Sequence, residues 1–248
     1  MFGRISYMKN KTGLFFKTDN LGDLPLVEQH IHTNFTDGAN SPEEIVEYAI
    51  KQGFSRIFFT EHVQRGSDWY PAFVQKMAEL KNKYSSKIDI IIGLEAKQIN
   101  QLGDLDCTDS QKAAAEVVMG SVHGYPATKE GKFYDFDDLT PEKALELELE
   151  NCLKLISRSA DLKMNVIGHP FGVYIKNYQK PVPEDHWRKV LAAATANNVA
   201  FDLNFKYHQP YFKIILAIAE ESGTFINIGS DVHSLAEFGQ AVKAVKNL

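Results

Sequence analysis

The sequence predicts an α/β fold: one domain built on a parallel sheet. Three observations predict it. From Leu26 onward, short apolar, β-branched runs alternate with helical stretches, as in consecutive β-α-β units. The runs are nearly continuously apolar, as expected of strands covered on both faces. No repeat, low-complexity segment or Pro/Gly/Ser-rich linker divides the chain. We therefore expect residues 26–248 to form a single domain and residues 1–25 to be an N-terminal extension packed on it.

Seven strands are expected, in order, from the apolar runs at residues 26–32, 56–62, 88–95, 117–123, 164–170, 199–205 and 224–231. A closed barrel and an open doubly wound sheet both fit this pattern. No GxGxxG follows the first run, so nothing supports a dinucleotide-binding fold.

Helices are expected between these strands at residues 41–53, 73–86 and 141–160. The first has the clearest end signals: Ser41 at the N-cap, Pro42 at the first helical position, and Glu44 three residues after the cap. Gly53 then stands where such a helix ends. Together these residues predict a capping box and a glycine C-cap.

Composition excludes several classes of protein. The net charge of −5 does not favour general binding to nucleic acid or to anionic membranes. No apolar run reaches the length of a membrane span, and residues 1–20 lack the apolar core of a signal peptide. The two cysteines, Cys107 and Cys152, form no CxxC, so neither a disulfide framework nor a cysteine zinc site is expected. We expect a cytoplasmic, reduced protein.

Reactive side chains follow the expected strands at one edge of the sheet. Glu95 ends the third strand and Asp231 ends the seventh. Because parallel strands point the same way, their carboxyl ends converge and distant residues meet in one pocket. Six of the eight histidines lie at such strand ends: His30, His32, His62, His123, His169 and His233.

Each of these residues alone has an ordinary structural explanation, such as a histidine bonded to a backbone carbonyl. One metal site explains all of them at once. Six imidazoles and two carboxylates exceed what a single zinc ion needs. The set predicts two or three divalent transition-metal ions, and ligands of nitrogen and oxygen without thiolate suit Zn, Mn or Fe.

The motifs HIHTNFTDG, TEH, GLE, GSVH, GHP and GSDVH follow one another on successive expected strands. In order, spacing and placement they resemble the polymerase-and-histidinol-phosphatase (PHP) superfamily of metal-dependent phosphoesterases. The resemblance runs from Leu26 to the end of the chain. It implies a distorted (β/α)7 TIM-like barrel with a trinuclear metal site.

The resemblance also implies a ligand set for each metal. His30, His32, Glu95 and Asp231 would hold the first metal, and Glu95 would bridge to a second held by His123 and His169. The third would be held by the set His62, His233 and Asp37. Two positions depart from the usual pattern: Glu28 replaces an Asp, and Asp202-Leu203-Asn204 replaces a Glu-x-Asn.

Closely spaced metals suit hydrolysis of a phosphate ester by a metal-activated hydroxide. Asp231 or His233 could pass a proton to the leaving alkoxide. Basic side chains near strand ends are candidate contacts for the substrate phosphate: Arg65, Lys97, Lys206 and His208. Arg65 is the first choice, as a catalytic and binding group, because a guanidinium binds phosphate bidentately.

The expected function is hydrolysis of a small phosphomonoester, as in a histidinol phosphatase. A sugar phosphate or a nucleoside monophosphate fits equally well. One alternative is an amidohydrolase-type metallohydrolase acting on a C–N or C–O bond, although such barrels usually have eight strands. Another is a non-catalytic metal-binding domain. The expected partner is a small phosphorylated metabolite, with neither nucleic acid nor membrane, and the oligomeric state is left open.

Overall fold

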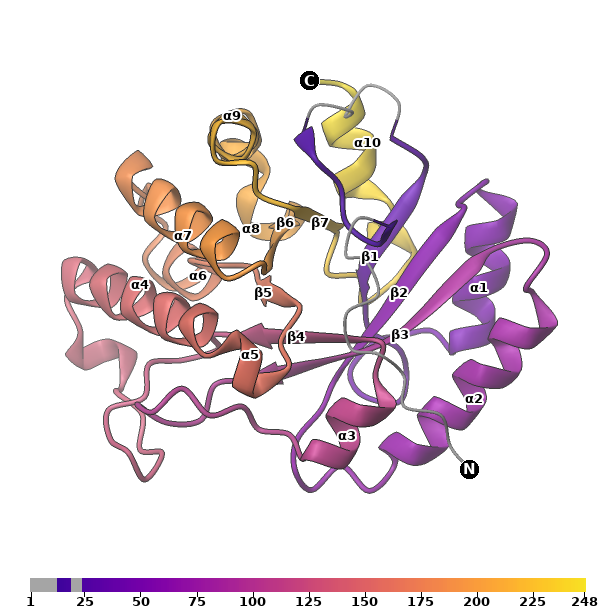
Figure 1. Ribbon diagram of the computed structural model, residues 1–248, viewed down its shortest axis with the longest axis horizontal. Coiled ribbons are helices and arrows are strands. Elements are labelled where there is room, and N and C mark those ends of the chain that lie inside the picture. Colours follow the sequence, from indigo (N-terminus) through magenta and orange to yellow (C-terminus); the bar gives the residue numbers. More distant parts are fainter. Residues whose placement is uncertain (1–12, 19–23) are drawn as a thin grey trace.

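The computed structural model describes residues 13–18 and 24–248. Their strands form one seven-stranded sheet in which each strand pairs in parallel with the next along the chain. In order these are β1 (Val27–Ile31), β2 (Arg56–His62), β3 (Asp89–Lys97), β4 (Val117–Ser121), β5 (Val166–Gly168), β6 (Ala200–Asn204) and β7 (Ile226–Gly229). All seven coincide with the expected apolar runs (Figure 1).

The two edges of the sheet meet beyond the ends of β1 and β7. The His32 amide donates to the Val232 carbonyl at 2.9 Å, and the Val232 amide donates to the His30 carbonyl at 2.9 Å. These bonds join the first strand to the last, so the sheet curves into a nearly closed barrel. The prediction of a single α/β domain with a distorted seven-stranded barrel is confirmed, and an open doubly wound sheet is excluded.

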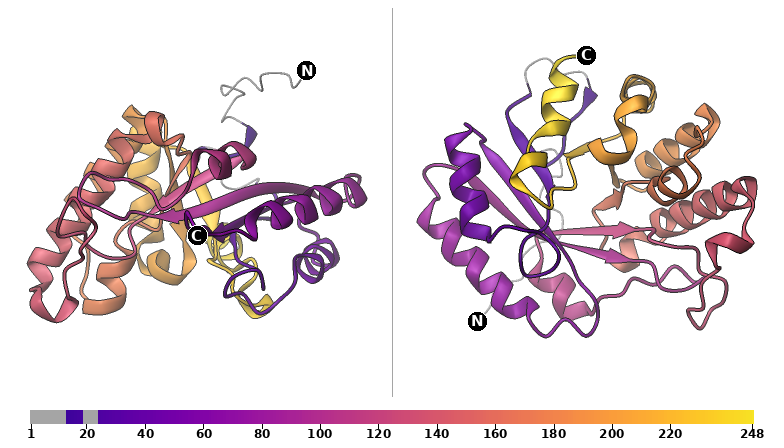
Figure 2. Two further views of the ribbon diagram at one scale, coloured as in Figure 1. Left: turned by 90° about the horizontal axis from the view of Figure 1, so that it is seen from below. Right: turned by 180° about the vertical axis from the view of Figure 1, so that it is seen from behind.

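Helices surround the strands on the outside, as the views in Figures 1 and 2 show. They are α1 (Pro42–Lys51), α2 (Tyr70–Lys83), α3 (Asp109–Ala114), α4 (Pro141–Ser157), α5 (Ser159–Leu162), α6 (Gly172–Tyr178), α7 (Glu184–Ala196), α8 (Phe205–His208), α9 (Phe212–Ser222) and α10 (Gln240–Lys246). Single 3-10 turns occur at η3 (Phe136–Asp138), η4 (Gln209–Tyr211) and η5 (Leu235–Glu237).

Local sequence accounts for most of the helix boundaries. At α1, the Ser41 hydroxyl accepts from the Glu44 amide and the Glu44 carboxylate accepts from the Ser41 amide, which is the predicted capping box. Gly53 follows the helix with a φ of +79°, a conformation that glycine adopts without strain. Two of the expected helices differ in their bounds. α2 spans Tyr70–Lys83 instead of 73–86, and the segment expected at 141–160 divides at Arg158 into α4 and α5, which ends at Leu162.

The core has two parts. The larger lies between the sheet and the helices. The smaller is built from alternate side chains of successive strands, including Phe58, Ile91, Met119 and Val166, with Phe15 packed among them. Alternation along a strand sends these side chains to one face of the curved sheet, so Phe15 fills space inside one end of the barrel.

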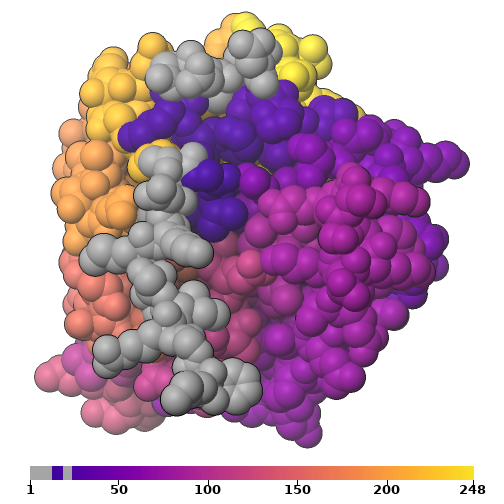
Figure 3. Space-filling model, turned by 45° about the vertical axis from the view of Figure 1, so that its right-hand side comes forward, coloured from indigo at the N-terminus to yellow at the C-terminus, as the bar shows by residue number. Residues whose placement is uncertain are grey.

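Part of the predicted N-terminal extension, residues 1–25, lies outside the described residues. Where it is described, Phe16 forms an antiparallel bridge with Ile226 of β7 and the Phe15 ring lies 6.2 Å from that of Phe58. In Figure 3, indigo residues from the start of the described chain lie beside orange and yellow residues from its end. Phe15 and Phe16 thus contact strands of the barrel, and the packing of the extension as a whole stays a prediction.

Two further findings concern the cysteines and the apolar character of the helices. Cys107 and Cys152 are both buried and unpaired, as expected of a chain without a disulfide framework. Over residues 13–18 and 24–248, none of the helices is apolar over a stretch long enough to cross a membrane.

Candidate metal centre

The candidate ligands gather at the carboxyl ends of the strands. His30 lies within β1 and His32 directly follows it, His62 ends β2, and Glu95 lies near the end of β3. The other candidates follow their strands: Asp37 lies in the turn after β1, His123 after β4, His169 directly after β5, and Asp231 and His233 after β7. Residues separated by as many as two hundred positions therefore reach a common site.

Nine candidate residues include three groups whose ligand atoms lie within 4.8 Å of one another. The groups are His30, His32 and Glu95; Glu95, His123 and His169; and His32, Asp37, His62 and His233. Glu95 belongs to the first two groups, and His32 to the first and third. The geometry thus allows three adjacent positions that share ligands.

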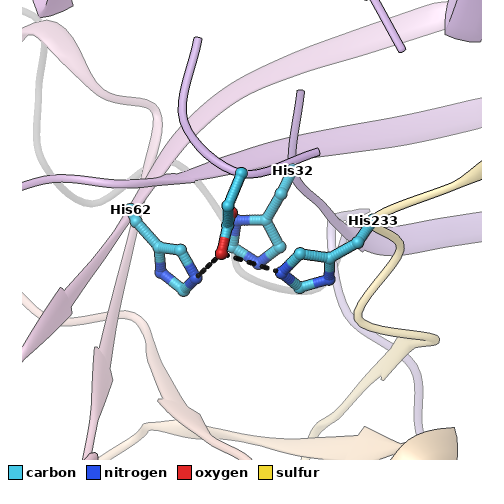
Figure 4. Close-up of side chains that lie close together, drawn as sticks. His32, His62 and His233 are labelled. Atoms are coloured by element: carbon cyan, nitrogen blue, oxygen red, sulfur yellow. Dashed lines mark ion pairs between the residues drawn. The ribbon is translucent and has the colours of Figure 1, made fainter. Parts of the chain in front are cut away.

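Asp231 adjoins the first group. Its Oδ1 lies 3.3 Å from His32 Nε2 and 3.7 Å from His30 Nε2. In the third group, Asp37 Oδ2 lies 3.4 Å from His233 Nε2 and 3.7 Å from His62 Nε2. Figure 4 shows the rings of His32, His62 and His233, the three histidines of this group, close together. These groups differ in two ways from the ligand sets that the resemblance implied: His32 also belongs to the third group, and Asp231 adjoins the first group without being part of it.

Buried polar atoms without partners test whether these residues suit a metal. Within the described chain, His30 Nε2, His32 Nε2 and Glu95 Oε2 are buried and make no well-formed hydrogen bond, although His62 Nδ1 lies 2.9 Å from Glu95 Oε2. Leaving such atoms unsatisfied costs free energy. All three belong to one group, in which Glu95 Oε2 lies 3.6 Å from His30 Nε2 and 3.7 Å from His32 Nε2. A divalent cation among them would satisfy all three, so the residues fit a metal ion.

Charge in the centre is distributed unevenly. Burial lowers the pKa of His32 to about 3, helped by the neighbouring His62, so its imidazole stays neutral, the form that binds metal. Burial opposes ionisation of Glu95, yet His123 and His62 hold its pKa well below the usual range. Burial likewise opposes protonation of His30, but Asp202 raises its pKa. The centre therefore offers an ionised carboxylate beside a neutral imidazole.

Two candidate ligands have unusual backbone conformations. His169 has a φ of +25° and Asp231 a φ of +56°. Residues other than glycine rarely adopt positive φ, and such strain concentrates at functional sites. The Asp202 carboxylate accepts from the His169 amide at 3.2 Å, which stabilises one of the two.

Two hollows adjoin the candidate ligands. The first, about 300 Å³, is lined by six of them (Asp37, His62, His123, His169, Asp231 and His233). The second, about 430 Å³, is lined by His62, Glu95 and His123. His62 and His123 border both.

Of the four predicted phosphate contacts, two line a hollow and two do not. Lys206 lines the first hollow, with Nζ 3.3 Å from Asp231 Oδ2, and Lys97 lines the second. Arg65 lines neither, and its guanidinium donates to the Leu105 carbonyl at 3.3 Å. His208 is buried, with its ring bonded to the Pro170 carbonyl and the Asn204 amide. Arg65 and His208 thus line neither of the two hollows, and their role as substrate contacts stays a prediction.

Residues that the sequence did not single out also line the first hollow: Phe136, Gly172, Val173, Lys176, Asn177 and Tyr207. Two of them could have been found, because Gly172 and Val173 closely follow the GHP motif. Phe136 comes from a long loop with no recognisable pattern.

The PHP domain family matches residues 28–206 of the chain. The match covers most of the sequence, including five of the six motifs. The chain belongs to the PHP domain family.

Individual relatives are distant. A probable phosphatase of Thermoanaerobacter sp. (strain X514) is 24% identical over 237 residues, which cover 90% of this chain and 86% of that protein. Two solved structures share the fold. The histidinol phosphate phosphatase of Lactococcus lactis, complexed with zinc, L-histidinol and phosphate, is 22% identical with a TM-score of 0.66, over 89% of this chain and 92% of the other. A Listeria monocytogenes protein described as a histidinol phosphatase is 21% identical with a TM-score of 0.69, over 88% and 98% of the two chains.

In this PHP domain, the two departures from the family pattern lie behind the candidate ligands. Glu28 is buried and accepts from the amides of Ser230 at 2.7 Å and Gly239 at 3.0 Å. It thus ties β1 to the turn that carries Asp231. Asp202 Oδ2 lies 3.0 Å from His30 Nδ1, so His30 is left with Nε2 as its free ligand atom.

Proposed function

We propose that this PHP domain is a metal-dependent hydrolase of a small phosphomonoester. Two or three divalent metal ions would be held by nine residues: His30, His32, Asp37, His62, Glu95, His123, His169, Asp231 and His233. The observation that carries the proposal is the convergence of His30 Nε2, His32 Nε2 and Glu95 Oε2, all buried and without well-formed hydrogen bonds in the described chain. Probable phosphatases among the relatives support it.

Divalent metals at such a site supply an activated water and neutralise charge on phosphoryl oxygens when bound. The side chains orient the reaction. Glu95, ionised and shared between two groups, can hold two cations close together. Lys206 Nζ, beside Asp231 at 3.3 Å, offers a donor to a phosphoryl oxygen that enters the first hollow.

Protonation of the leaving alkoxide falls to Asp231 or His233. His233 Nδ1 lies 2.9 Å from the Asp231 carbonyl, so Nδ1 carries a proton and Nε2 faces Asp37. Asp231 presents Oδ1 to His32 and Oδ2 to Lys206. Lys97 in the second hollow is a further candidate contact for the substrate.

Release of inorganic phosphate from a panel of phosphomonoesters tests the proposal. The panel includes histidinol phosphate, sugar phosphates and nucleoside monophosphates. We expect wild type to release phosphate from at least one ester and His32→Ala to lose most of that activity, because His32 belongs to two of the three groups.

His186→Gln is the matched control. His186 lies on α7, paired with Glu146 at 3.2 Å, and lines neither hollow. Activity that His32→Ala leaves unchanged would overturn the proposal. Hydrolysis of amides or lactones without any phosphate release would favour the amidohydrolase-type alternative instead.

A further inference from the structure

The first hollow has a part that the candidate ligands do not form. Its walls there come from η3, α6 and α8, with the residues Phe136, Gly172, Val173, Lys176, Asn177, Lys206 and Tyr207. If the phosphoryl group of a substrate lies among the metals, the rest of the substrate meets this lining. Its chemistry therefore bears on which ester is accepted.

The lining is cationic. Its polar groups beyond the ligands are the ammonium groups of Lys176 and Lys206, the Asn177 amide and the Tyr207 hydroxyl. The two carboxylates that line the hollow, Asp37 and Asp231, both belong to the candidate ligand set. Bound metal ions would add further positive charge.

The two lysines differ in their partners. Lys206 pairs with Asp231 at 3.3 Å, so part of its charge is already compensated. For Lys176, an exposed residue of α6, residues 13–18 and 24–248 supply no ion pair. Its charge is therefore available to a ligand in the hollow.

The helix that carries Lys176 is held firmly against the site. The buried carboxylate of Glu148 accepts from the Val173 amide at 3.2 Å and from the Tyr174 amide at 2.7 Å. At Gly172 the chain passes so close to the ligand loop that a Cβ would lie 3.1 Å from His169 Nδ1. The backbone around Lys176 thus has a defined place relative to the candidate ligands.

We propose that the substrate carries a second anionic group, distant from the reacting phosphoryl group, and that Lys176 recognises it. This rests on the proposed phosphomonoesterase function and names its substrate class. An ester of an amino alcohol such as L-histidinol, which the Lactococcus lactis structure contains, would bring an ammonium group toward Lys176 instead. The lining therefore disfavours histidinol phosphate and favours phosphorylated acids or bisphosphates.

The test uses alkyl phosphates of two to four carbons that differ only at the far end: carboxylate, hydroxyl or ammonium. We expect wild type to prefer carboxylate over hydroxyl by roughly fivefold in kcat/KM, the scale of a partly exposed ion pair. The preference should lie mainly in KM, because Lys176 touches the substrate far from the reacting atoms. The ammonium ester should be the poorest substrate.

Three variants assign the preference to a residue. Lys176→Met should abolish it, and Lys176→Glu should reverse it so that the ammonium ester becomes the better substrate. Lys180→Met is the matched control, because Lys180 is exposed, lies 3.9 Å from Glu142 and lines neither hollow. Lys180→Met should keep the wild-type order of preference among the three esters.

The outcomes separate this inference from the proposed function. Hydrolysis of all three esters at equal kcat/KM would overturn the role of Lys176 while the phosphatase function stands. A preference that survives in Lys176→Glu would overturn it as well. No hydrolysis of any phosphomonoester, in this series or in the wider panel, would overturn both.

Discussion

At the scale of single residues, the Asp202 carboxylate touches two candidate metal ligands at once. Its Oδ2 lies 3.0 Å from His30 Nδ1 and accepts from the His169 amide at 3.2 Å. The Asn227 side chain donates to Oδ1 at 2.7 Å. Burial opposes the ionised form, yet His30 lowers the pKa of Asp202. A buried, ionised carboxylate behind a histidine fixes the ring and makes its free nitrogen a better ligand.

Asp202→Asn should therefore weaken metal binding while leaving the fold intact. Loss of such a partner typically lowers metal affinity by about 10- to 100-fold. Competition with a chromophoric zinc chelator measures this directly. Asp185→Asn, an exposed position on α7, is the control and should bind zinc like wild type. Equal affinity of Asp202→Asn and wild type would contradict the role assigned to Asp202.

At the scale of elements, Glu148 links α4 to the segments that follow two ligands. Besides the two amides of α6, it accepts from the Tyr125 hydroxyl at 2.8 Å, and Tyr125 lies two residues after His123. Burial raises the pKa of Glu148 from 4.5 to about 7, although its hydrogen bonds act in the opposite direction. One carboxylate thus stabilises the segments after both β4 and β5, and its protonation is coupled to folding.

The sign of that coupling follows from the two pKa values. Below pH 4.5, Glu148 is protonated in both states. Between 4.5 and 7 the unfolded chain releases the proton while the folded chain keeps it. The free energy of unfolding therefore falls as pH rises through that interval, by about 3 kcal/mol at most. Above pH 7 no further change is expected from this group.

Urea unfolding of chelator-treated protein tests this. The difference in unfolding free energy between wild type and Glu148→Gln should become less favourable to wild type as pH rises from 4.5 to 7, because glutamine does not titrate. Glu146→Gln, at an exposed position of the same helix, should show no comparable trend. A difference for Glu148→Gln that is independent of pH would exclude the raised pKa.

At the scale of the whole molecule, the site depends on closure of the barrel between β1 and β7. Gly229 ends β7 directly against β1: a Cβ there would lie 2.4 Å from His30 Cβ. That distance is shorter than any real contact, and the backbone of both strands would have to separate. Closure therefore brings His30 and Asp231 within reach of each other.

Gly229→Ala should both destabilise the protein and weaken metal binding. Overpacking of this kind costs roughly 1–3 kcal/mol. Gly66→Ala is the matched control, because no atom lies within 4 Å of a Cβ at that position. Thermal unfolding and zinc stoichiometry, measured on both variants, check the prediction. A Gly229→Ala protein with unchanged stability and metal content would show that the strands tolerate separation.

The sequence predicted this architecture well because strand order and ligand order coincide. Each apolar run formed a strand, and the barrel brought the strand-end residues from His30 to His233 into one site. Position at a strand end does not, however, determine where a longer side chain points. Arg65 turns toward Leu105, and His208 folds back on a helical turn to contact Asn204. Lys176 was missed because its place depends on how a whole helix packs.

Phosphate release by chelator-treated protein, measured as Zn²⁺ or Mn²⁺ is added back in stoichiometric steps, tests the central claim most directly. Three adjacent groups share Glu95 and His32. We therefore predict no release without metal and activity that appears only as the second equivalent binds. Phosphate release at full rate by the metal-free protein, or none at any metal loading with any phosphomonoester, would contradict the account.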